Sequence, residues 1–289
     1  MRDSFGDKIF SAVVYTLLTL LLLLCLGPLL NIVAVSLSST TAIQTGKVFL
    51  WPVEISFDSY KLLVHGTRIT RSLLNSVQLT VVGVVLCMAC TICTAYPLSK
   101  SYFIGRRFFS LAIVFSMLFS GGLIPTYMVV KTLGLLDSYY SIWLPGLIST
   151  FNVLIMKSYF ENISREIEEA ARMDGCGEFR IIIRIMLPLS LPMIATLALF
   201  YGVGFWNAFM SILIYINSSE KYTLTVLVQQ MIQSQSLLQE QMQSDALQQM
   251  VPESIKSAAI MVMVLPMLIV YPFLQKYFVK GVMLGSVKG

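Results

Sequence analysis

Long apolar runs alternate with shorter charged segments along this chain. Six runs without Asp, Glu, Lys, Arg or His each extend over at least 19 residues, which is enough for a helix to cross a hydrocarbon layer of about 30 Å. Transporters driven by ions normally carry an ionisable group within the membrane, so this pattern argues against ion coupling. We predict an all-α integral membrane protein with six transmembrane helices, near residues 9–37, 72–98, 108–130, 138–158, 187–214 and 257–278.

The amino-acid composition supports the membrane assignment. Of the 289 residues, 56% are hydrophobic and 12% are charged, and the mean hydropathy is +0.78, whereas a soluble domain carries about 25% charged residues. The first apolar run is too long for the core of a secretory signal peptide, and no small-residue cleavage site follows it. We therefore interpret residues 1–71 as a retained N-terminal membrane helix with an outer loop.

The distribution of basic residues predicts the orientation. With the N-terminus inside, 13 of the 20 Lys and Arg residues lie in segments on the cytoplasmic side, as the positive-inside rule requires. Residues 157–187 alone carry five of them. We therefore expect a multi-pass protein of the cell membrane with both termini in the cytoplasm, and with residues 38–71 and 217–256 outside.

One charged, amphipathic segment separates the fourth and fifth apolar runs. Ser164 is a candidate N-cap, and acidic residues follow it in the first turns, where they favour the positive end of a helix. Gly175 stands where a residue with positive φ would end this helix. In a second short helix we expect Phe179, Ile182 and Ile183 to point inward. The pattern predicts a helix–Gly–helix element on the membrane surface; an amphipathic helix that only rests on lipid is the alternative.

The sequence contains no arrangement typical of an enzyme. It has one histidine, His65, no nucleophile–base pair and no phosphate-binding loop, so we do not expect this chain to hydrolyse ATP. Cys87, Cys90 and Cys93 have a spacing also found in metal sites. They lie mid-span without His or carboxylate neighbours, and small residues at this spacing more often allow close helix packing. We therefore expect no metal site.

The spacing within the charged segment resembles that of the EAA loop of binding-protein-dependent ABC importer permeases. In order, the segment contains Glu169-Ala170-Ala171, three residues, Gly175, nine residues, Ile185, one residue and Leu187-Pro188. The likeness covers nearly the whole chain and is greatest to carbohydrate-uptake permeases, in particular the six-span subunit of the maltose-permease type. Further stretches that carry it lie at 95–99, 121–126, 133–137, 206–207 and 277–282.

The resemblance implies the architecture of a type I ABC importer permease (MetI-like). Residues 72–278 would form the ABC transmembrane type-1 domain with the cytoplasmic EAA loop at 161–188, and residues 279–289 would be a cytoplasmic tail. The residues that the resemblance assigns to ATPase coupling are Glu169, Ala170, Ala171, Asp174, Gly175, Ile185, Leu187 and Pro188.

The resemblance also implies a function and partners. The chain would be a permease subunit of an ATP-driven ABC importer for sugars or oligosaccharides in a bacterial inner or plasma membrane, and would form half of the pathway. Its partners would be a second permease chain in a heterodimer, two ATP-binding subunits and an extracytoplasmic solute-binding protein, but no nucleic acid. ATP and Mg²⁺ would bind to the ATPase subunits and no cofactor to this chain. The alternatives are a permease for a non-sugar solute such as a peptide, and a membrane scaffold or channel protein.

Candidate residues of the substrate pathway come from two of the apolar runs. Gly and Pro at short spacing predict a kink or a close helix crossing, and aromatic and amide side chains suit a sugar ring. The candidates are Gly121, Gly122, Pro125, Tyr201, Trp206 and Asn207. Packing alone, or anchoring at the membrane interface, is the alternative. The Gln-rich segment 217–256 is expected to form a surface helix that docks a soluble protein or only caps the bundle.

Overall fold

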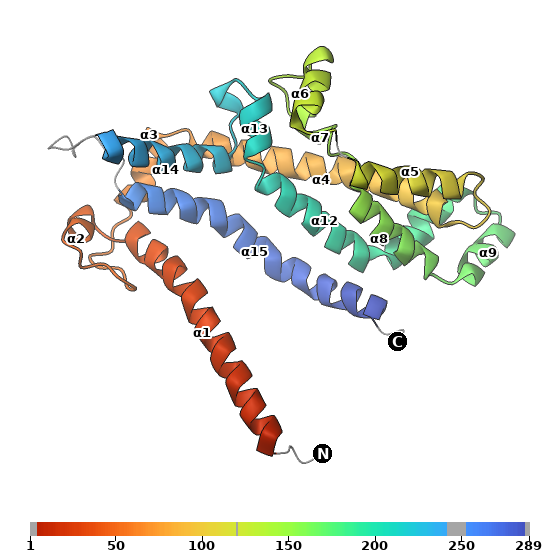
Figure 1. Cartoon of the computed structure of the whole chain (residues 1–289), viewed down its shortest axis with the longest axis horizontal. Coiled ribbons are helices and arrows are strands. Elements are labelled where there is room, and N and C mark those ends of the chain that lie inside the picture. The colour runs from red at the N-terminus through yellow and green to blue at the C-terminus, as the bar shows by residue number, and fades with distance from the viewer. Residues whose placement is uncertain (1–4, 120, 242–252, 287–289) are drawn as a thin grey trace. The chain divides into compact units, whose positions relative to one another are not determined.

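The computed structural model describes residues 5–119, 121–241 and 253–286 (Figure 1). In these residues every named element is a helix, and the one extended pairing is an isolated antiparallel bridge between Ser38 and Ile55. The prediction of an all-α fold is therefore confirmed. The chain divides into two compact units: residues 1–70 with 227–266, and residues 71–226 with 267–289.

The first unit begins with the first predicted membrane helix. Helix α1 (Phe5–Ser36) is long and apolar, and its most hydrophobic stretch of 18 residues buries none of them. Leu side chains such as Leu23, which is 65% exposed, therefore face outward, as a helix in contact with lipid requires. The short helices α2 (Thr40–Gln44) and α3 (Asp58–Gly66) follow.

The Gln-rich segment is helical over the part that the structure describes. Helix α14 (Leu224–Gln241) agrees with the predicted surface helix, and residues 242–252 lie outside the described residues. Helix α15 (Glu253–Ser286) contains the last predicted membrane helix. Because α15 continues through residues 279–286, most of the predicted tail is an extension of this helix and not a separate segment. Residues 287–289 lie outside the described part.

In the second unit, two apolar helices cross closely because glycines face the contact. They are α4 (Ile69–Ser99), the second predicted membrane helix, and α12 (Leu191–Trp206). A Cβ atom added at Gly83 would lie 2.6 Å from a ring carbon of Phe205, and one at Gly202 would lie 3.7 Å from the side chain of Val84. Small residues at such a crossing let helix backbones approach closely in a membrane.

The other three predicted membrane helices are interrupted in the structure. Helices α5 (Arg106–Leu118) and α6 (Leu123–Thr132) are bent relative to each other, where Gly122 has a φ of +84°. The predicted helix at 187–214 also breaks, because the helical run before α12 is bent by 83° from it at Ser190. Prolines at 188 and 192 flank this bend, and each lacks the N–H of a helical hydrogen bond.

The predicted helix at 138–158 is two separate helices. The short α7 (Tyr140–Trp143) and α8 (Thr150–Glu161) are separated at Pro145-Gly146, and the Ser149 side chain caps α8 by accepting from the Asn152 N–H. Among the described residues, three helices are long and apolar enough to cross a membrane, or up to five if each bent pair is one span. The remaining elements are α9 (Arg165–Met173), α10 (Glu178–Ile181), η1 (Ile182–Met186), α11 (Leu187–Leu189), α13 (Met210–Tyr215) and η2 (Ser219–Lys221).

The core of the second unit lies between α4, α8 and α12. Trp143 is only 5% exposed and donates from Nε1 to the Leu79 carbonyl at 3.0 Å. Cys87 is fully buried and its thiol donates to the Gly146 carbonyl at 3.5 Å, which agrees with a packing role. The fully buried side chains include Leu79, Val153, Met156, Ile181, Met186, Leu197 and Ile212.

Candidate coupling surface and translocation cavity

The charged loop, residues 161–188, contains the predicted helix–Gly–helix element. Gly175 follows α9 with a φ of +78°. Its N–H donates to the Arg172 carbonyl at 3.0 Å, and the Cys176 N–H donates to the Ala171 carbonyl at 2.9 Å, which are the two hydrogen bonds of a Schellman motif. The predicted left-handed glycine is therefore confirmed. Ser164 stands at the N-cap position, but its side chain makes no capping hydrogen bond.

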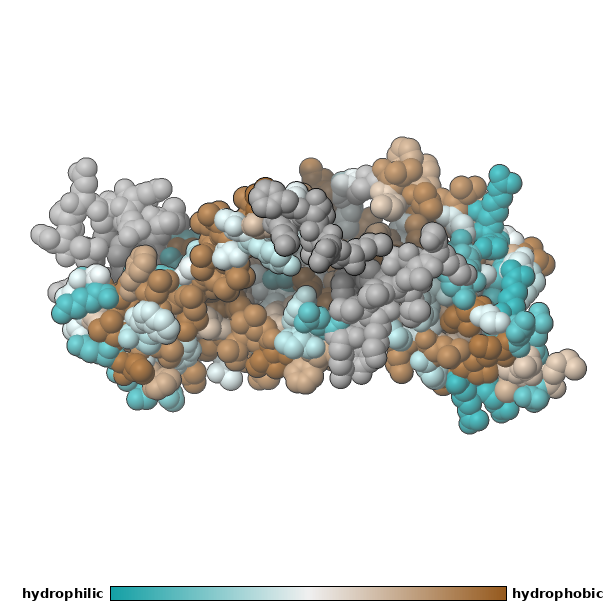
Figure 2. Space-filling model, turned by 90° about the horizontal axis from the view of Figure 1, so that it is seen from below, coloured by the Kyte–Doolittle hydropathy of each residue, from teal (hydrophilic) through white to brown (hydrophobic). Residues whose placement is uncertain are grey.

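Of the three residues predicted to point inward in the loop's second half, only Ile182 packs against the core. Ile181 and Met186 are fully buried, whereas Phe179 is 79% exposed and Ile183 is 61% exposed. After α10 the chain passes into a π-helical turn, η1, which shifts the register so that the buried Ile181 and Met186 lie five residues apart. Met173 at the end of α9 is 89% exposed. Figure 2 shows hydrophobic and hydrophilic residues side by side on the end of the unit that holds α9.

The eight residues assigned to coupling differ in exposure. Glu169 is exposed and lines a cavity of about 260 Å³ with Lys100, Arg106 and Arg165. The cavity lies between the charged loop and the segment that joins α4 to α5, so the structure adds basic residues that the motif does not contain. The other seven divide into exposed residues and partly or fully buried ones: Ala170, Asp174, Gly175 and Pro188 are exposed, whereas Ala171, Ile185 and Leu187 are not.

A buried ion pair joins the charged loop to the end of α4. The Lys100 ammonium and the Glu168 carboxylate form a hydrogen-bonded salt bridge, and their side chains are only 9% and 10% exposed. The ammonium also lies 4.5 Å from the centroid of the Tyr96 ring, within the range of a cation–π interaction. Sequence reasoning missed this pair because its members are 68 positions apart and no local pattern connects them.

A second set of contacts joins the other half of the loop to the same helix end. The Tyr96 hydroxyl donates to Glu178 at 2.8 Å, and Arg172 pairs with Glu178 at 2.5 Å. Arg172 also donates to the Tyr102 hydroxyl at 2.5 Å, and burial raises the pKa of Tyr102, so this hydroxyl stays neutral. Both α9 and α10 are therefore tied to residues 96–102.

Only one of the six pathway candidates lines the cavity that α8 and α12 form. The cavity has about 500 Å³ and lies between α8 and α12, next to α7. Tyr201 lines it, and its hydroxyl is fixed by a hydrogen bond of 2.8 Å with Thr91 and by accepting from the Ser149 N–H at 3.2 Å. The lining residues are aromatic, aliphatic, hydroxyl or amide groups without a charge: Ile142, Ser149, Phe151, Asn152, Phe200, Tyr201, Gly204, Phe205, Ala208 and Ser211.

The other pathway candidates lie elsewhere. Trp206 is 6% exposed, and Asn207 donates from its side chain to the Val203 carbonyl one turn back in α12 at 3.0 Å. Pro125 lines a different cavity, of about 430 Å³, while Gly121 and Gly122 are exposed at the start of α6. The structure therefore does not bring the six together.

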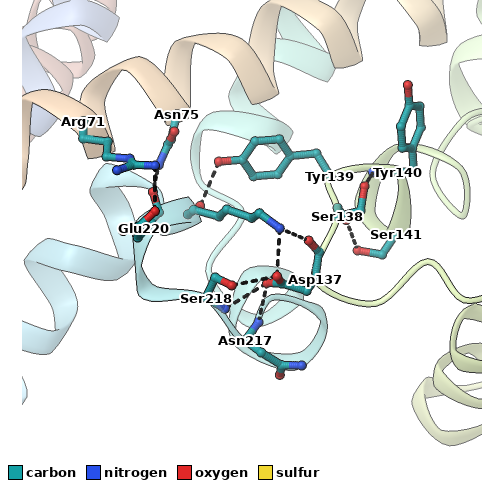
Figure 3. A network of polar contacts seen from close by, with 11 residues as sticks. Arg71, Asn75, Asp137, Ser138, Tyr139, Tyr140, Ser141, Asn217, Ser218 and Glu220 are labelled. Carbon is teal, nitrogen blue, oxygen red and sulfur yellow. Dashed lines mark hydrogen bonds and ion pairs between the residues drawn. The ribbon is translucent and has the colours of Figure 1, made fainter.

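Asp137 is the centre of a clamp between the loop after α6 and the segment before α14 (Figure 3). It has a φ of +57°, and its carboxylate accepts from the Asn217 and Ser218 N–H groups at 3.0 and 2.8 Å, from the Ser218 hydroxyl at 2.7 Å and from Lys221 Nζ at 2.8 Å. The hydrogen bonds from Lys221 and then Ser218 hold the pKa of this carboxyl well below its usual value. We call residues 137 and 217–221 the Asp137 clamp.

Helix α4 and the loop before α7 add to the Asp137 clamp. Arg71 pairs with Glu220 at 2.9 Å, and the Asn75 amide donates to the Glu220 and Tyr222 carbonyls at 2.8 and 3.0 Å. The Tyr139 hydroxyl donates to the Lys221 carbonyl at 2.8 Å (Figure 3). Within the described residues, no group of three His, Cys, Asp or Glu side chains is placed to hold a metal ion.

Known proteins match this chain over nearly its full length. A family model for binding-protein-dependent transport system inner membrane components matches residues 1–284. The chain is 42% identical over 284 residues to the polygalacturonan/rhamnogalacturonan transport system permease protein YtcP of Bacillus subtilis (strain 168), which covers 98% of this chain and 99% of that protein. It is 44% identical over 264 residues to protein LplC of the same strain, covering 91% and 89%.

A solved structure has the same fold. The match is to a chain from the crystal structure of a bacterial ABC transporter involved in the import of the acidic polysaccharide alginate, with a TM-score of 0.86, 34% identity and coverage of 96% of this chain and 99% of that one. The fold is therefore that of a MetI-like membrane protein, and the protein is a transport component and not an enzyme. This chain belongs to the family of binding-protein-dependent transport system inner membrane components, as a permease subunit of an ABC importer.

Proposed function

We propose that this permease subunit imports saccharides and that its charged loop receives the motion of an ATPase on the cytoplasmic side. A second permease chain, two ATPase subunits that bind ATP and Mg²⁺, and an extracytoplasmic solute-binding protein complete the transporter. The observation that carries the coupling role is the exposure of Met173 and Phe179, at 89% and 79%, on an otherwise charged loop.

Exposed large apolar side chains on a polar loop are typical of a protein interaction surface. Phe179 offers a rigid aromatic anchor and Met173 an adaptable apolar one. The Schellman turn at Gly175 fixes the direction in which the chain leaves α9, so both side chains are presented by a preorganised loop. Closure of the ATPase pair around ATP would displace this loop as a unit and so change the arrangement of the membrane helices.

The proposed orientation follows from the basic residues. Residues 157–187 carry five of the 20 Lys and Arg residues, which favours the cytoplasmic side for the charged loop. Both termini then lie in the cytoplasm as well. The Asp137 clamp and the Gln-rich segment 217–256 lie outside, where a solute-binding protein would dock.

The cavity between α8 and α12 supports a saccharide substrate. Its volume of about 500 Å³ falls within the range of small-molecule sites. Tyr201, Phe151 and Phe200 offer ring faces for the apolar faces of sugars, and Ser149 and Asn152 offer groups that hydrogen-bond to hydroxyls. The names of two similar proteins, a permease for polygalacturonan and rhamnogalacturonan and an alginate transporter, support the same substrate class.

Co-purification of the ATPase subunits tests the coupling role. Phe179→Ala and Met173→Ala in the tagged full-length permease should lower ATPase retention about tenfold each, the size expected for interface anchors. Phe115→Ala and Met128→Ala are matched controls, since these side chains are 58% and 62% exposed outside the charged loop. Equal retention by all four variants would reject the charged loop as the docking surface.

Uptake by a deletion strain tests the substrate class. Loss of growth on one or more oligosaccharides, restored by the intact gene, is the expected result. A strain that loses uptake of peptides and keeps uptake of every saccharide tried would assign the transporter to another solute.

A further inference from the structure

The Lys100–Glu168 pair has a position that packing alone does not explain. Lys100 directly follows the last residue of α4, and its N–H donates to the Pro97 carbonyl at 3.1 Å, so its backbone continues the helix end. Glu168 lies in the first turn of α9. The pair thus connects an apolar helix long enough to cross a membrane with the helix that, in the proposed function, meets the ATPase.

We propose that Lys100 and Glu168 are positioning residues that transmit the displacement of α9 to α4 during transport. The inference rests on the proposed coupling role of the charged loop and adds the route by which motion leaves the loop. Neither residue belongs to the EAA spacing, so the motif does not predict this role.

Burial makes this pair suitable for transmitting motion. With side chains 9% and 10% exposed, both charges have little access to water that could replace the partner, so separating them is unfavourable. The Arg71–Glu220 pair of the same unit has side chains that are both 57% exposed, and water can compensate when such a pair opens. A displacement of α9 therefore moves the end of α4 with it, whereas an exposed pair would separate.

The contacts around Tyr96 extend the same connection to the second half of the loop. Tyr96 lies under the Lys100 ammonium and donates to Glu178, which precedes Phe179. Arg172 of α9 bonds to the same Glu178. Both exposed anchors of the loop are therefore within a few residues of a contact to residues 96–100, and the loop and the helix end move together.

The test is the amount of solute moved per ATP hydrolysed by the complex purified through this chain and reconstituted in vesicles. Lys100→Met and Glu168→Gln should each lower this ratio about tenfold or more, which is a typical coupling effect, while ATPase subunits stay bound through Met173 and Phe179. The charge swap Lys100→Glu with Glu168→Lys should recover at least half of the ratio, and Lys100→Arg should retain it. Lys61→Met is the control for an exposed pair, since the Lys61 and Asp58 side chains are 71% and 74% exposed, and it should leave the ratio unchanged.

The outcomes separate this proposal from the proposed function. Retained ATPase subunits with an unchanged ratio in Lys100→Met would overturn the transmission role and leave the docking role intact. If the single variants are absent from the membrane, the charge-swap variant provides the test. A charge-swap variant that assembles normally and still moves little solute per ATP would also overturn the transmission role, because the pair would then serve assembly alone. Failure of the wild-type chain to retain an ATPase would instead reject the proposed function.

Discussion

At the charged loop, one buried ion pair between Lys100 and Glu168 holds two helices together, whereas in the Asp137 clamp one carboxylate collects four hydrogen bonds from a neighbouring segment. The ion pair depends on charge complementarity and burial, and its members could exchange places. The clamp depends on one residue with a left-handed backbone and on backbone N–H donors, so its acceptor and donors cannot be swapped between positions. The first design allows strong coupling between moving parts, and the second fixes a loop in one conformation.

Removing one member of the buried pair should have the largest effect on stability. Glu168→Ala leaves the Lys100 charge buried without its partner, which should destabilise the protein by about 3–5 kcal/mol. The double variant Lys100→Met with Glu168→Leu should lie within about 1 kcal/mol of wild type, because an apolar pair has no desolvation penalty. Thermal unfolding of the purified chain measures both. Equal losses in the single and double variants would contradict the electrostatic explanation.

Removing the Asp137 carboxylate should have the next largest effect. Asp137→Ala leaves the Asn217 and Ser218 N–H groups without their acceptor and removes one of the two acceptors of Lys221 at residue 137, for a loss of about 2 kcal/mol after allowing for partial exposure. Asp137→Asn should lose roughly half as much, since Asn keeps one acceptor oxygen and tolerates a positive φ. Unfolding temperatures of the two variants check the order. Equal losses for Asn and Ala would mean that the negative charge itself, not the acceptor geometry, holds the clamp.

A substitution at Gly175 separates backbone conformation from space. No atom lies within 4 Å of a Cβ built at this position, but its φ is +78°, so Gly175→Val should cost about 1–2 kcal/mol through backbone strain alone. Gly175→Asn should cost much less, because Asn adopts this conformation more readily. ATPase retention and limited proteolysis of the charged loop provide the measurement. Similar behaviour of both variants would indicate that side-chain size, and not φ, matters there.

Acidification should have the smallest effect, and only on the clamp. The pKa of Asp137 is lowered on folding, so its contribution to stability is complete above the usual Asp pKa of about 3.9 and is lost as the pH falls through the lower folded value. The stability difference between wild type and Asp137→Asn should therefore be the same at about pH 7 and pH 5. A difference that shrinks between these two pH values would show that the clamp does not hold the carboxylate as the structure indicates.

The sequence alone was sufficient for the fold class, the membrane character and the helix–Gly–helix element of the charged loop. These follow from local properties: runs of apolar residues, the distribution of charge, and a glycine placed where only a positive φ ends the helix. Such signals lie within a few residues of one another, so they can be read without knowing the fold.

Only the tertiary structure decided which side chains of the charged loop face outward and what holds the loop. The π-helical turn η1 places the buried Met186 five residues after the buried Ile181, a register change that the apolar pattern does not reveal. Lys100 and Glu168 are far apart in the sequence and meet through folding, as do Asp137 and Lys221. The interrupted membrane helices have the same origin, since Gly and Pro permit a bend but packing determines whether the helix takes it.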